Sequence, residues 1–394
     1  MLAYACDPLG SGEHWLGWGW AEVASQVGNL TLYTRSEAKH ALKPLCRAAG
    51  IQMHCVDLPL SVREASCRFG AAGSWWRKVA WAKAAAKAVA QKKQEFHCIH
   101  QTTFHTFRVP FYAASLGLPS LWGPIGGGES TPRGFEDFLG RAARSEHRRG
   151  QLNRLCLRWP SVLNSLRRVD KIFVSNRTTL DFLPQFAQSK CELVPANTVR
   201  DGDAVAASAG AKTKHRELRL VYAGNCVATR CLPLVFEAMK GVDNLHLTVA
   251  GEGPALAEWK PWAATSGASI AFTGKLDRDR LKSLYEESDV LVFPALRDSG
   301  GSALLEAMSI GLPVVCLDWG GPGEVVDTES GIKIPVNDPD QVIRGLRDAF
   351  LRLRDDQELR DRLARHGATR ATTKFTWEWK RKLLQRTYSE LTGL

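Results

Sequence analysis

Two carboxylates flank a pair of glycines in the stretch DSGGSALLEAMSIGLPVV, which begins at Asp298. Gly300 and Gly301 let the backbone approach a ligand closely, and the free N–H groups of a helix beginning at Ser302 suit a phosphate. Glu306 follows within that helix, and a carboxylate accepts paired hydrogen bonds from hydroxyl groups. A phosphate seat beside two hydroxyl-binding carboxylates predicts a nucleotide-sugar site. The alternative is that Asp298 caps the helix and Glu306 is a surface residue.

Two further glycine loops are candidates for anion binding. The loop GEGP, residues 251–254, follows an apolar run, but a dinucleotide fingerprint would need a small residue where Leu256 stands. This spacing argues against a hydride-transferring dehydrogenase, and the glycines also suit a tight turn. The loop PLGSGEHW places Gly10 and Gly12 before a predicted helix, where backbone N–H groups suit an anion, although a simple turn explains them almost as well.

The glycine loops can form one binding site only if strands and helices bring them to the same edge of a sheet. Short apolar runs alternate with helix-like segments along the chain, which favours a parallel sheet with helices on both faces. Ligands of such sheets bind outside the carboxyl ends of the strands. Strands are predicted at residues 1–6, 30–34, 51–58, 96–101, 120–128, 171–176, 191–196, 218–224, 245–251, 268–274, 289–295, 312–318 and 331–336, and helices at 14–27, 37–50, 76–93, 232–242, 254–266, 277–288 and 301–311.

The length of 394 residues suits two domains. Residues 201–217 are rich in Ala, Gly, Ser and charge without periodicity, which is typical of a linker. We therefore expect an α/β protein with an N-terminal Rossmann-like domain at residues 1–200 and a C-terminal one at 218–374. Two such domains, with their parallel sheets facing each other, would enclose a cleft.

Composition is that of a globular protein, with 44% hydrophobic and 24% charged residues. Ten cysteines without a CxxC pair indicate reduced thiols rather than disulfides or a zinc site. The N-terminus lacks the pattern of a signal peptide, and no apolar run is long enough to span a membrane. These features predict a cytoplasmic protein.

A net charge of +11 implies an anionic partner. Much of the excess lies between Arg133 and Arg168, where eight arginines, 141, 144, 148, 149, 154, 158, 167 and 168, accompany only the acids 136, 137 and 146. This region is either a solvated helix face or a surface for anionic head groups or an anionic substrate. The second reading predicts peripheral contact with the inner face of a membrane, which Trp75, Trp76 and Trp159 would also suit, unless they are core residues.

The stretch FPALRDSGGSALLEAMSIGLPVVCLDWGGPGEVV closely resembles the donor-binding region of the retaining glycosyltransferases of family 4, the glycosyl transferases group 1, which have the GT-B fold. That family carries two glutamates separated by seven residues. The second matches Glu306, whereas the shorter Asp298 stands in place of the first. VYAGNCVATRC is similar to the diphosphate-binding segment, with Asn225 for the usual arginine, Arg230 for the lysine and Cys231 for the glycine.

Three other segments extend the resemblance over nearly the whole chain. GSGE at residues 10–13 looks like the N-terminal glycine loop of the family. FTWEWKRKLLQRTYSEL resembles its closing helix, here within residues 375–394, which packs back on the first domain. WGPIGGGE at residues 122–129 resembles the GPxGGGE motif of one branch.

The resemblance implies a hexosyl-type glycosyltransferase (EC 2.4) that moves a sugar from a nucleoside-diphosphate sugar, with UDP the expected nucleotide, to a hydroxyl acceptor with retention of configuration. It implies neither a metal nor a further cofactor. Catalytic roles fall on Asp298, Glu129 and Arg230, although Glu129 would serve as well in capping a helix. The donor side comprises Gly12, Asn225, Arg230, Gly251, Lys275, Leu276, Asp298, Ser299, Gly300, Gly301, Ser302 and Glu306. The acceptor side comprises His14, His105, Gly126, Gly127, Gly128 and Glu129, with a structural role for His105 favoured when it is taken alone.

The acceptor would be a saccharide or a lipid-linked saccharide of polysaccharide or glycolipid biosynthesis. One alternative is a nucleotide-sugar epimerase, which can share the fold. A second is a basic protein that binds membranes or nucleic acid, but positive charge alone does not require the motifs of the second domain, so we expect no nucleic-acid partner. A third is a degenerate transferase, because Asn225 and Asp298 depart from the family pattern.

Overall fold

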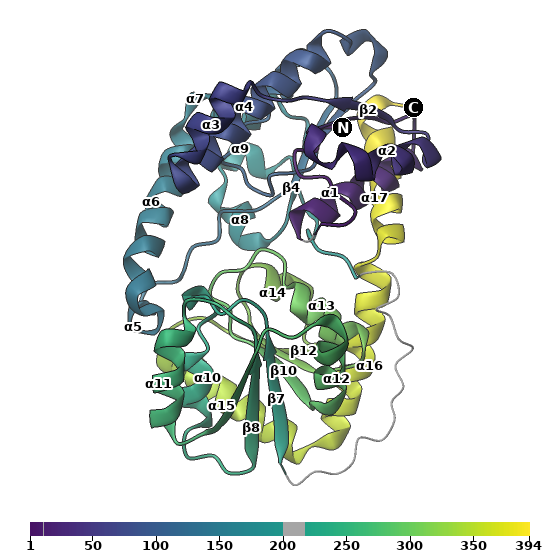
Figure 1. Ribbon diagram of the computed structural model, residues 1–394. Coiled ribbons are helices and arrows are strands. Elements are labelled where there is room, and N and C mark those ends of the chain that lie inside the picture. Colours follow the sequence, from purple (N-terminus) through teal and green to yellow (C-terminus); the bar gives the residue numbers. More distant parts are fainter. Residues whose placement is uncertain (11, 200–216) are drawn as a thin grey trace. The chain divides into compact units, whose positions relative to one another are not determined.

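The computed structural model describes residues 1–10, 12–199 and 217–394 (Figure 1). The chain divides into two compact units. The first contains residues 1–128, 151–196 and 377–394, and the second contains residues 129–150 and 197–376. The predicted linker, 201–217, lies outside the described residues except for Glu217. No helix of the described ranges is long and apolar enough to cross a membrane.

The first unit is built on parallel strands. Four of them, β3 (Ile99–Gln101), β4 (Ser120–Ile125), β5 (Lys171–Val174) and β6 (Cys191–Leu193), form a sheet in chain order, and β1 (Thr31–Thr34) pairs with β2 (Gln52–Cys55). The strand predicted at residues 1–6 was wrong in extent. Only Leu2 forms bridges there, one to Tyr33 and one to Gln101, which link β1 to β3.

Helices of the first unit accompany these strands, and aromatic side chains join the first of these helices to the last. The helices are α1 (Glu13–Ser25), α2 (Lys39–Ala48), α3 (Leu60–Cys67), α4 (Gly70–Ala90), α7 (Pro160–Arg168), α8 (Arg177–Phe182), α9 (Gln185–Gln188) and α17 (Trp377–Thr392), with the second half of α6 (Ala143–Arg158). Trp20 of α1 is fully buried and lies edge-on to Trp377, with ring centroids 6.0 Å apart. The C-terminal helix α17 is therefore part of the core of the first unit.

The second unit contains one parallel sheet in the order β12-β11-β10-β7-β8-β9. Its strands are β7 (Leu218–Ala223), β8 (Leu245–Ala250), β9 (Ser269–Gly274), β10 (Val290–Phe293), β11 (Val314–Leu317) and β12 (Gly331–Ile334). Numbered within the unit, this is the order 3-2-1-4-5-6 of a dinucleotide-type doubly wound sheet, which reverses direction between β7 and β10. Both strands are buried throughout apart from Arg219, as expected for a sheet with both faces covered.

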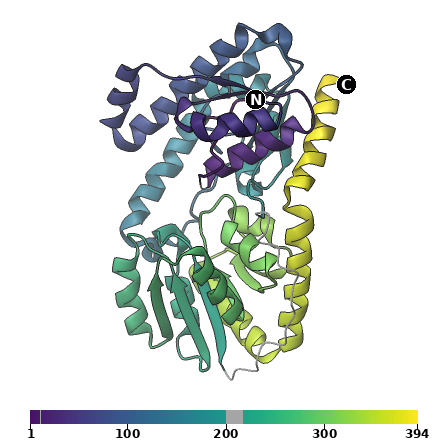
Figure 2. The ribbon, with the colours of Figure 1, turned by 45° about the vertical axis from the view of Figure 1, so that its right-hand side comes forward.

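The helices of the second unit are α5 (Glu136–Leu139), α10 (Pro233–Met239), α11 (Leu256–Ser266), α12 (Arg278–Glu287), α13 (Ser302–Ser309), α14 (Gly320–Val325), α15 (Pro339–Asp355) and α16 (Gln357–Lys374). Figure 2 shows its strands between helices. Aspartates cap three of them: the side chains of Asp277, Asp338 and Asp356 accept N–H groups of the first turns of α12, α15 and α16.

Residues 129–150 belong to the second unit because their apolar side chains pack in its core. Phe135 and Leu139 are buried in its core, and Phe138 stacks on Trp262 with ring centroids 5.5 Å apart. Burial of each such side chain contributes on the order of 1.5–3 kcal/mol. The arginine-rich composition of this region conceals these three apolar anchors.

Candidate functional site

The loops after β7 and β10 meet at the point where the strand order of the second sheet reverses. The N–H of Leu296 donates to the carbonyl of Thr229 (2.9 Å), which joins the two loops. The hydroxyl of Tyr222 donates to the carbonyl of Asn225 (2.9 Å) and fixes the first of them. These backbone contacts place Arg230 and Asp298, both predicted as donor-binding residues, beside each other.

Arg230 and Asp298 form an ion pair in which each side chain is largely buried, with 19% and 13% of its surface exposed. The guanidinium also lies over the ring of Phe293, 4.9 Å from its centroid. The N–H groups of Gly300 and Gly301 donate to Asp298 Oδ1 over 2.7 and 2.6 Å. The cation and the two glycine N–H groups thus converge on one anionic group.

Backbone conformation and close packing explain why Gly300 and Gly301 are glycines. Gly301 has φ +61°, a left-handed value that glycine adopts without strain, and α13 begins at the next residue. A Cβ at Gly300 would lie 2.2 Å from the side-chain nitrogen of Asn197. That same nitrogen donates to the hydroxyl of Ser302 (2.7 Å). Ser299 is half-buried in the same loop, and Glu306 lies one turn into α13 with an exposed side chain.

The loops after β8 and β9 complete this edge of the sheet. The N–H of Gly251 donates to the carbonyl of Gly274 (2.9 Å), and a Cβ at Gly251 would lie 1.9 Å from the carbonyl oxygen of Gly224. Glycine is therefore required for the close approach of these loops. Lys275 is exposed and Leu276 half-buried, both directly after β9.

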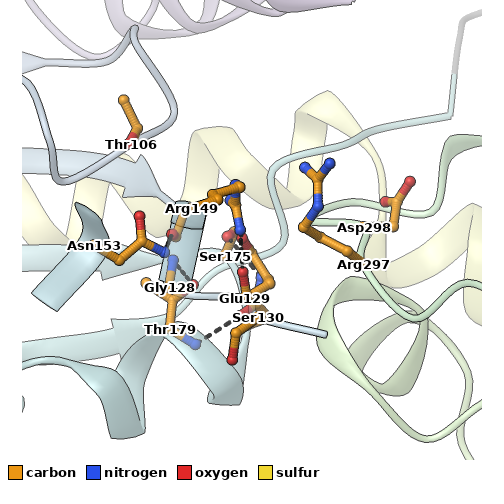
Figure 3. A network of polar contacts seen from close by, with 12 residues as sticks. Thr106, Gly128, Glu129, Ser130, Arg149, Asn153, Ser175, Thr179, Arg297 and Asp298 are labelled. Atoms are coloured by element: carbon orange, nitrogen blue, oxygen red, sulfur yellow. Dashed lines mark hydrogen bonds and ion pairs between the residues drawn. The ribbon is translucent and has the colours of Figure 1, made fainter. Parts of the chain in front are cut away.

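Glu129 lies in the second unit, although it was expected on the first domain, because the segment that it begins packs in the second core. Its side chain is 3% exposed, and Oε2 lies 4.0 Å from Nη2 of Arg149, whose other terminal nitrogen donates to the Glu129 carbonyl (Figure 3). Trp319 Nε1 donates to the carbonyl of Ser130 (3.1 Å). A buried carboxylate is thus held next to the loop that follows β11.

Sequence reasoning missed two kinds of residue in this unit. Arg297, next to Asp298, pairs with Glu146 at 2.9 Å between Nε and Oε2, and nothing in the sequence connects two residues 151 positions apart. Gly320 and Gly321 lie in the stretch that resembles the donor-binding region, but no role was predicted for them. Gly321 N–H donates to the carbonyl of Asp298 (2.8 Å), and a Cβ at Gly320 would lie 2.6 Å from that carbonyl oxygen.

The predicted acceptor-side residues of the first unit, and Gly12 of the predicted donor side, follow β3 and β4 or lie at the start of α1. Gly12 is exposed with φ +56° at the start of α1, and His14 is half-buried in its first turn. His105 has φ +33°, which is unusual for a non-glycine residue, and its buried Nε2 has no hydrogen-bond partner among the described residues. Burial lowers the pKa of His105, and the carboxylate of Glu13 opposes that shift.

The predicted loop 126–128 is tightly held in the first unit. Gly126 N–H donates to the carbonyl of His105 (3.1 Å), and Gly128 N–H donates to the hydroxyl of Thr179 (3.2 Å). The carbonyl of Gly127 accepts from Asn153 (2.8 Å). The loop and His105 therefore form one hydrogen-bonded structure at the carboxyl ends of β3 and β4.

Comparison with known proteins now bears on these two groups of residues. Residues 207–370 match the family model described as glycosyl transferases group 1, and they contain every predicted donor-side residue except Gly12. This region of the chain is therefore similar to the glycosyl transferases group 1. The resemblance inferred from the motifs is confirmed at the level of the family, whereas the GPxGGGE branch stays a prediction.

Two curated relatives share a region of similar length with this chain. Sulfoquinovosyl transferase SQD2 of Arabidopsis thaliana is 27% identical over 180 residues, which cover 41% of this chain and 35% of that protein. Glycogen synthase of Mycobacterium tuberculosis is 32% identical over 167 residues, which cover 40% of this chain and 39% of that protein. The chain thus spans well under half the length of these two relatives.

The fold is shared over a longer range. The crystal structure of Anabaena HepE in complex with UDP is similar with a TM-score of 0.65 and 13% identity, and the match covers 99% of each chain. The predicted α/β fold class, GT-B with two parallel sheets, is confirmed. All ten cysteines are free, and among the described residues no three His, Cys, Asp or Glu side chains gather to hold a metal ion.

Proposed function

We propose that this protein transfers a sugar from a nucleoside-diphosphate sugar, with UDP as the nucleotide, to a hydroxyl acceptor with retention of configuration. The observation that carries the proposal is the convergence of Arg230 and the N–H groups of Gly300 and Gly301 on one anionic group at the switch point of the second sheet. Such donors stabilise the negative charge that develops on a leaving diphosphate. The family, and the UDP bound by the similar protein HepE, support this reading.

The donor residues take roles that follow from their positions. Glu306, exposed on α13, would accept hydrogen bonds from ribose hydroxyls, and Asp298 from the hydroxyls of the sugar. Backbone groups at Lys275 and Leu276 would meet the base, while Asn225 and Gly251 border the diphosphate. Because Arg230 and the backbone supply positive charge, no metal is required for the departure of the diphosphate.

The acceptor is proposed to bind the first unit near His14, His105 and the loop 126–128. His105 has a strained backbone and a buried nitrogen that finds no partner within the part of the chain that the structure describes, and such features accumulate at functional sites. Glu129, buried beside the loop after β11, is proposed to orient the reacting hydroxyl or sugar.

A lipid-linked acceptor is the proposal that fits the surface of the first unit. Leu152 and Leu155 on α6 are exposed by 58% and 59%, beside the exposed arginines 154 and 158, and Trp76 on α4 is 58% exposed. Apolar and cationic side chains together suit an anionic bilayer surface. Sedimentation with phosphatidylglycerol vesicles, and its absence with phosphatidylcholine vesicles, is the expected result. If the protein sediments with neither kind of vesicle, the membrane is removed from the proposal.

Calorimetry with UDP-, GDP- and ADP-sugars tests the donor, and Arg230→Ala tests the site. Arg370 is a matched control because it also pairs with an aspartate, Asp327, and lies over a phenylalanine, Phe375, at 5.6 Å. We expect Arg230→Ala to weaken UDP-sugar binding at least tenfold and to lower the transfer rate on the order of 100-fold, with Arg370→Ala close to wild type. Equal loss in both variants, or no donor binding by the wild type, would overturn the proposal.

Incubation with the donor alone separates the transferase from an epimerase of the same fold. A transferase leaves the sugar configuration unchanged without an acceptor, apart from slow hydrolysis. Conversion of the donor to its epimer would show that the transferase proposal is wrong even if donor binding is intact.

A further inference from the structure

The carboxylate of Asp298 uses both of its oxygens inside the protein. Oδ1 accepts the N–H groups of Gly300 (2.7 Å) and Gly301 (2.6 Å), and Oδ2 pairs with Arg230. Asp298 is 13% exposed in its side chain, so these contacts are shielded from water and are stronger than they would be at the surface.

These three partners are the groups that the proposed function assigns to the diphosphate. Arg230 is held in place from its other side by the ring of Phe293, 4.9 Å from the guanidinium carbon. A diphosphate can therefore take over the glycine N–H groups, and the Arg230 nitrogen that faces Asp298, only if the carboxylate leaves them. The carboxylate of Asp298 thus occupies the position that the proposed function assigns to the diphosphate.

We infer that Asp298 is an internal anion that the diphosphate of the donor displaces, an inference that rests on the proposed function. The displacement needs only rotation of the side chain, because the backbone is anchored: the carbonyl of Asp298 accepts the N–H of Gly321 (2.8 Å), and Leu296 N–H donates to Thr229 (2.9 Å). Side-chain rotation is fast compared with catalytic turnover. The two anions exchange without movement of the loop.

The displaced carboxylate becomes available to the hydroxyl groups of the sugar. Diphosphate binding and sugar recognition are then coupled through one residue. A nucleoside diphosphate without a sugar displaces Asp298 and leaves that charge without a hydroxyl partner, whereas a nucleotide sugar supplies one. Asp298 therefore selects the intact donor over the released nucleoside diphosphate, which favours departure of the product.

Asp327 provides a matched control in the same unit. Its Oδ1 accepts two backbone N–H groups, from Glu329 (3.3 Å) and Ser330 (2.9 Å), and its Oδ2 pairs with Arg370 (2.6 Å). This repeats the arrangement around Asp298, but after α14 rather than at the switch point. Asp327→Asn removes the same kind of charge without touching the proposed donor site.

The test is the affinity for UDP, measured by calorimetry, in the full-length wild type, Asp298→Asn and Asp327→Asn. We expect Asp298→Asn to bind UDP about tenfold more tightly, because an amide competes less well for Arg230, and to lose most of the preference for UDP-sugar over UDP. Asp327→Asn is expected to bind UDP as the wild type does. Asp298→Ser, which is also uncharged, is the second variant if Asp298→Asn does not fold.

Combination with Arg230→Gln separates displacement from simple repulsion between two negative charges. Repulsion predicts the same gain with and without the arginine, whereas displacement predicts that the gain disappears in Arg230→Gln. A gain that persists in Arg230→Gln, or equal or weaker binding of UDP by Asp298→Asn and Asp298→Ser, would overturn the inference alone. A wild type that binds no nucleoside diphosphate would overturn the proposed function as well.

Discussion

The imidazole of His100 on β3 contacts the hydroxyl of Tyr388 on α17, with 2.8 Å between Nδ1 and the hydroxyl oxygen. Its Nε2 lies 2.9 Å from the carbonyl of Gly123, so Nε2 carries the proton and Nδ1 accepts from the tyrosine. A side chain of β3 thereby fixes helix α17. The contact requires a neutral imidazole.

This contact predicts acid sensitivity of the first unit. Burial lowers the pKa of His100 to about 3, although the hydrogen bond to Gly123 opposes the shift. The unfolded chain takes up a proton near pH 6.5, so the contribution to stability is complete above that pH and is lost as the pH falls toward 3. We expect the free energy of unfolding to fall by up to about 1.4 kcal/mol per pH unit between pH 6 and 4.

Denaturant unfolding of the wild type and His100→Asn at several pH values checks this prediction. We expect His100→Asn to be less stable than the wild type at pH 7. Its free energy of unfolding should fall less steeply between pH 6 and 4. Parallel slopes would show that other groups dominate the acid response.

Lys380 predicts a second dependence on pH in a different window. The side chain is buried between the rings of Trp20 and Trp377, which favour the ammonium, and Nζ donates to the carbonyl of Ala196 (2.7 Å). Burial lowers the pKa of Lys380 well below its usual value. Because the unfolded state then binds more protons below the ordinary lysine pKa, the free energy of unfolding should rise as the pH approaches that pKa from below.

Lys380→Met tests whether burial of the charge outweighs the contacts of the ammonium. We expect the melting temperature at pH 7 to stay equal or to rise, because a hydrophobic group of similar shape requires no desolvation. The rise in stability from pH 7 to 10 should disappear. A strongly destabilised variant would show that the two indole rings hold the ammonium more firmly than burial disfavours it.

The ion pair of Glu146 and Arg297 should couple the segment 129–150 to the loop after β10. The Glu146 side chain is 9% exposed and Arg297 32%, so the pair is shielded from solvent only in part. A double-mutant cycle with Glu146→Gln and Arg297→Gln is expected to give a coupling energy of about 1–2 kcal/mol in denaturant unfolding. The pair Arg354 and Asp355, in which Asp355 is 63% exposed, is the comparison and should couple more weakly.

Gly251→Ala should disturb the edge of the sheet where the donor is proposed to bind. The added Cβ would lie 1.9 Å from the carbonyl oxygen of Gly224, so the loops after β7 and β8 must separate. Overpacking of this kind costs about 1–3 kcal/mol. Gly241→Ala is the control for backbone strain alone, because its φ is also positive (+69°) but nothing lies within 4 Å of an added Cβ. Loss of UDP binding only in Gly251→Ala is expected, and equal loss in both would contradict the steric argument.

The sequence allowed most strands and helices to be predicted, because each apolar run is short and bounded by glycine, proline or a cap. Residues 1–6 form only a bridge at Leu2, although their composition resembles that of a strand. The assignment of residues 129–150 to the second unit was not predictable, since three apolar anchors at 135, 138 and 139 are hidden among arginines. Local composition does not reveal which core a segment will join.

Part of the candidate site was likewise predictable. Arg230, Asp298 and the glycine pair were named from their residue types, and the order of the strands brings them together. The contacts of Asp298 with Arg230 and with the glycine N–H groups were not predicted. The sequence pattern indicates which residues bind a ligand, but it does not indicate which of these residues contact one another. Arg297 and Glu146 were missed because their contact depends on tertiary structure alone.

The position of α17 in the core of the first unit has a consequence for biosynthesis. Residues 377–394 are synthesised after the whole second unit, yet Leu383 and Leu384 are buried in the first core together with Trp20. Every residue of the second unit is translated before them. The part of the protein that is made first therefore completes its folding last, and a nascent chain that stalls near residue 376 carries a finished second unit and an unfinished first one.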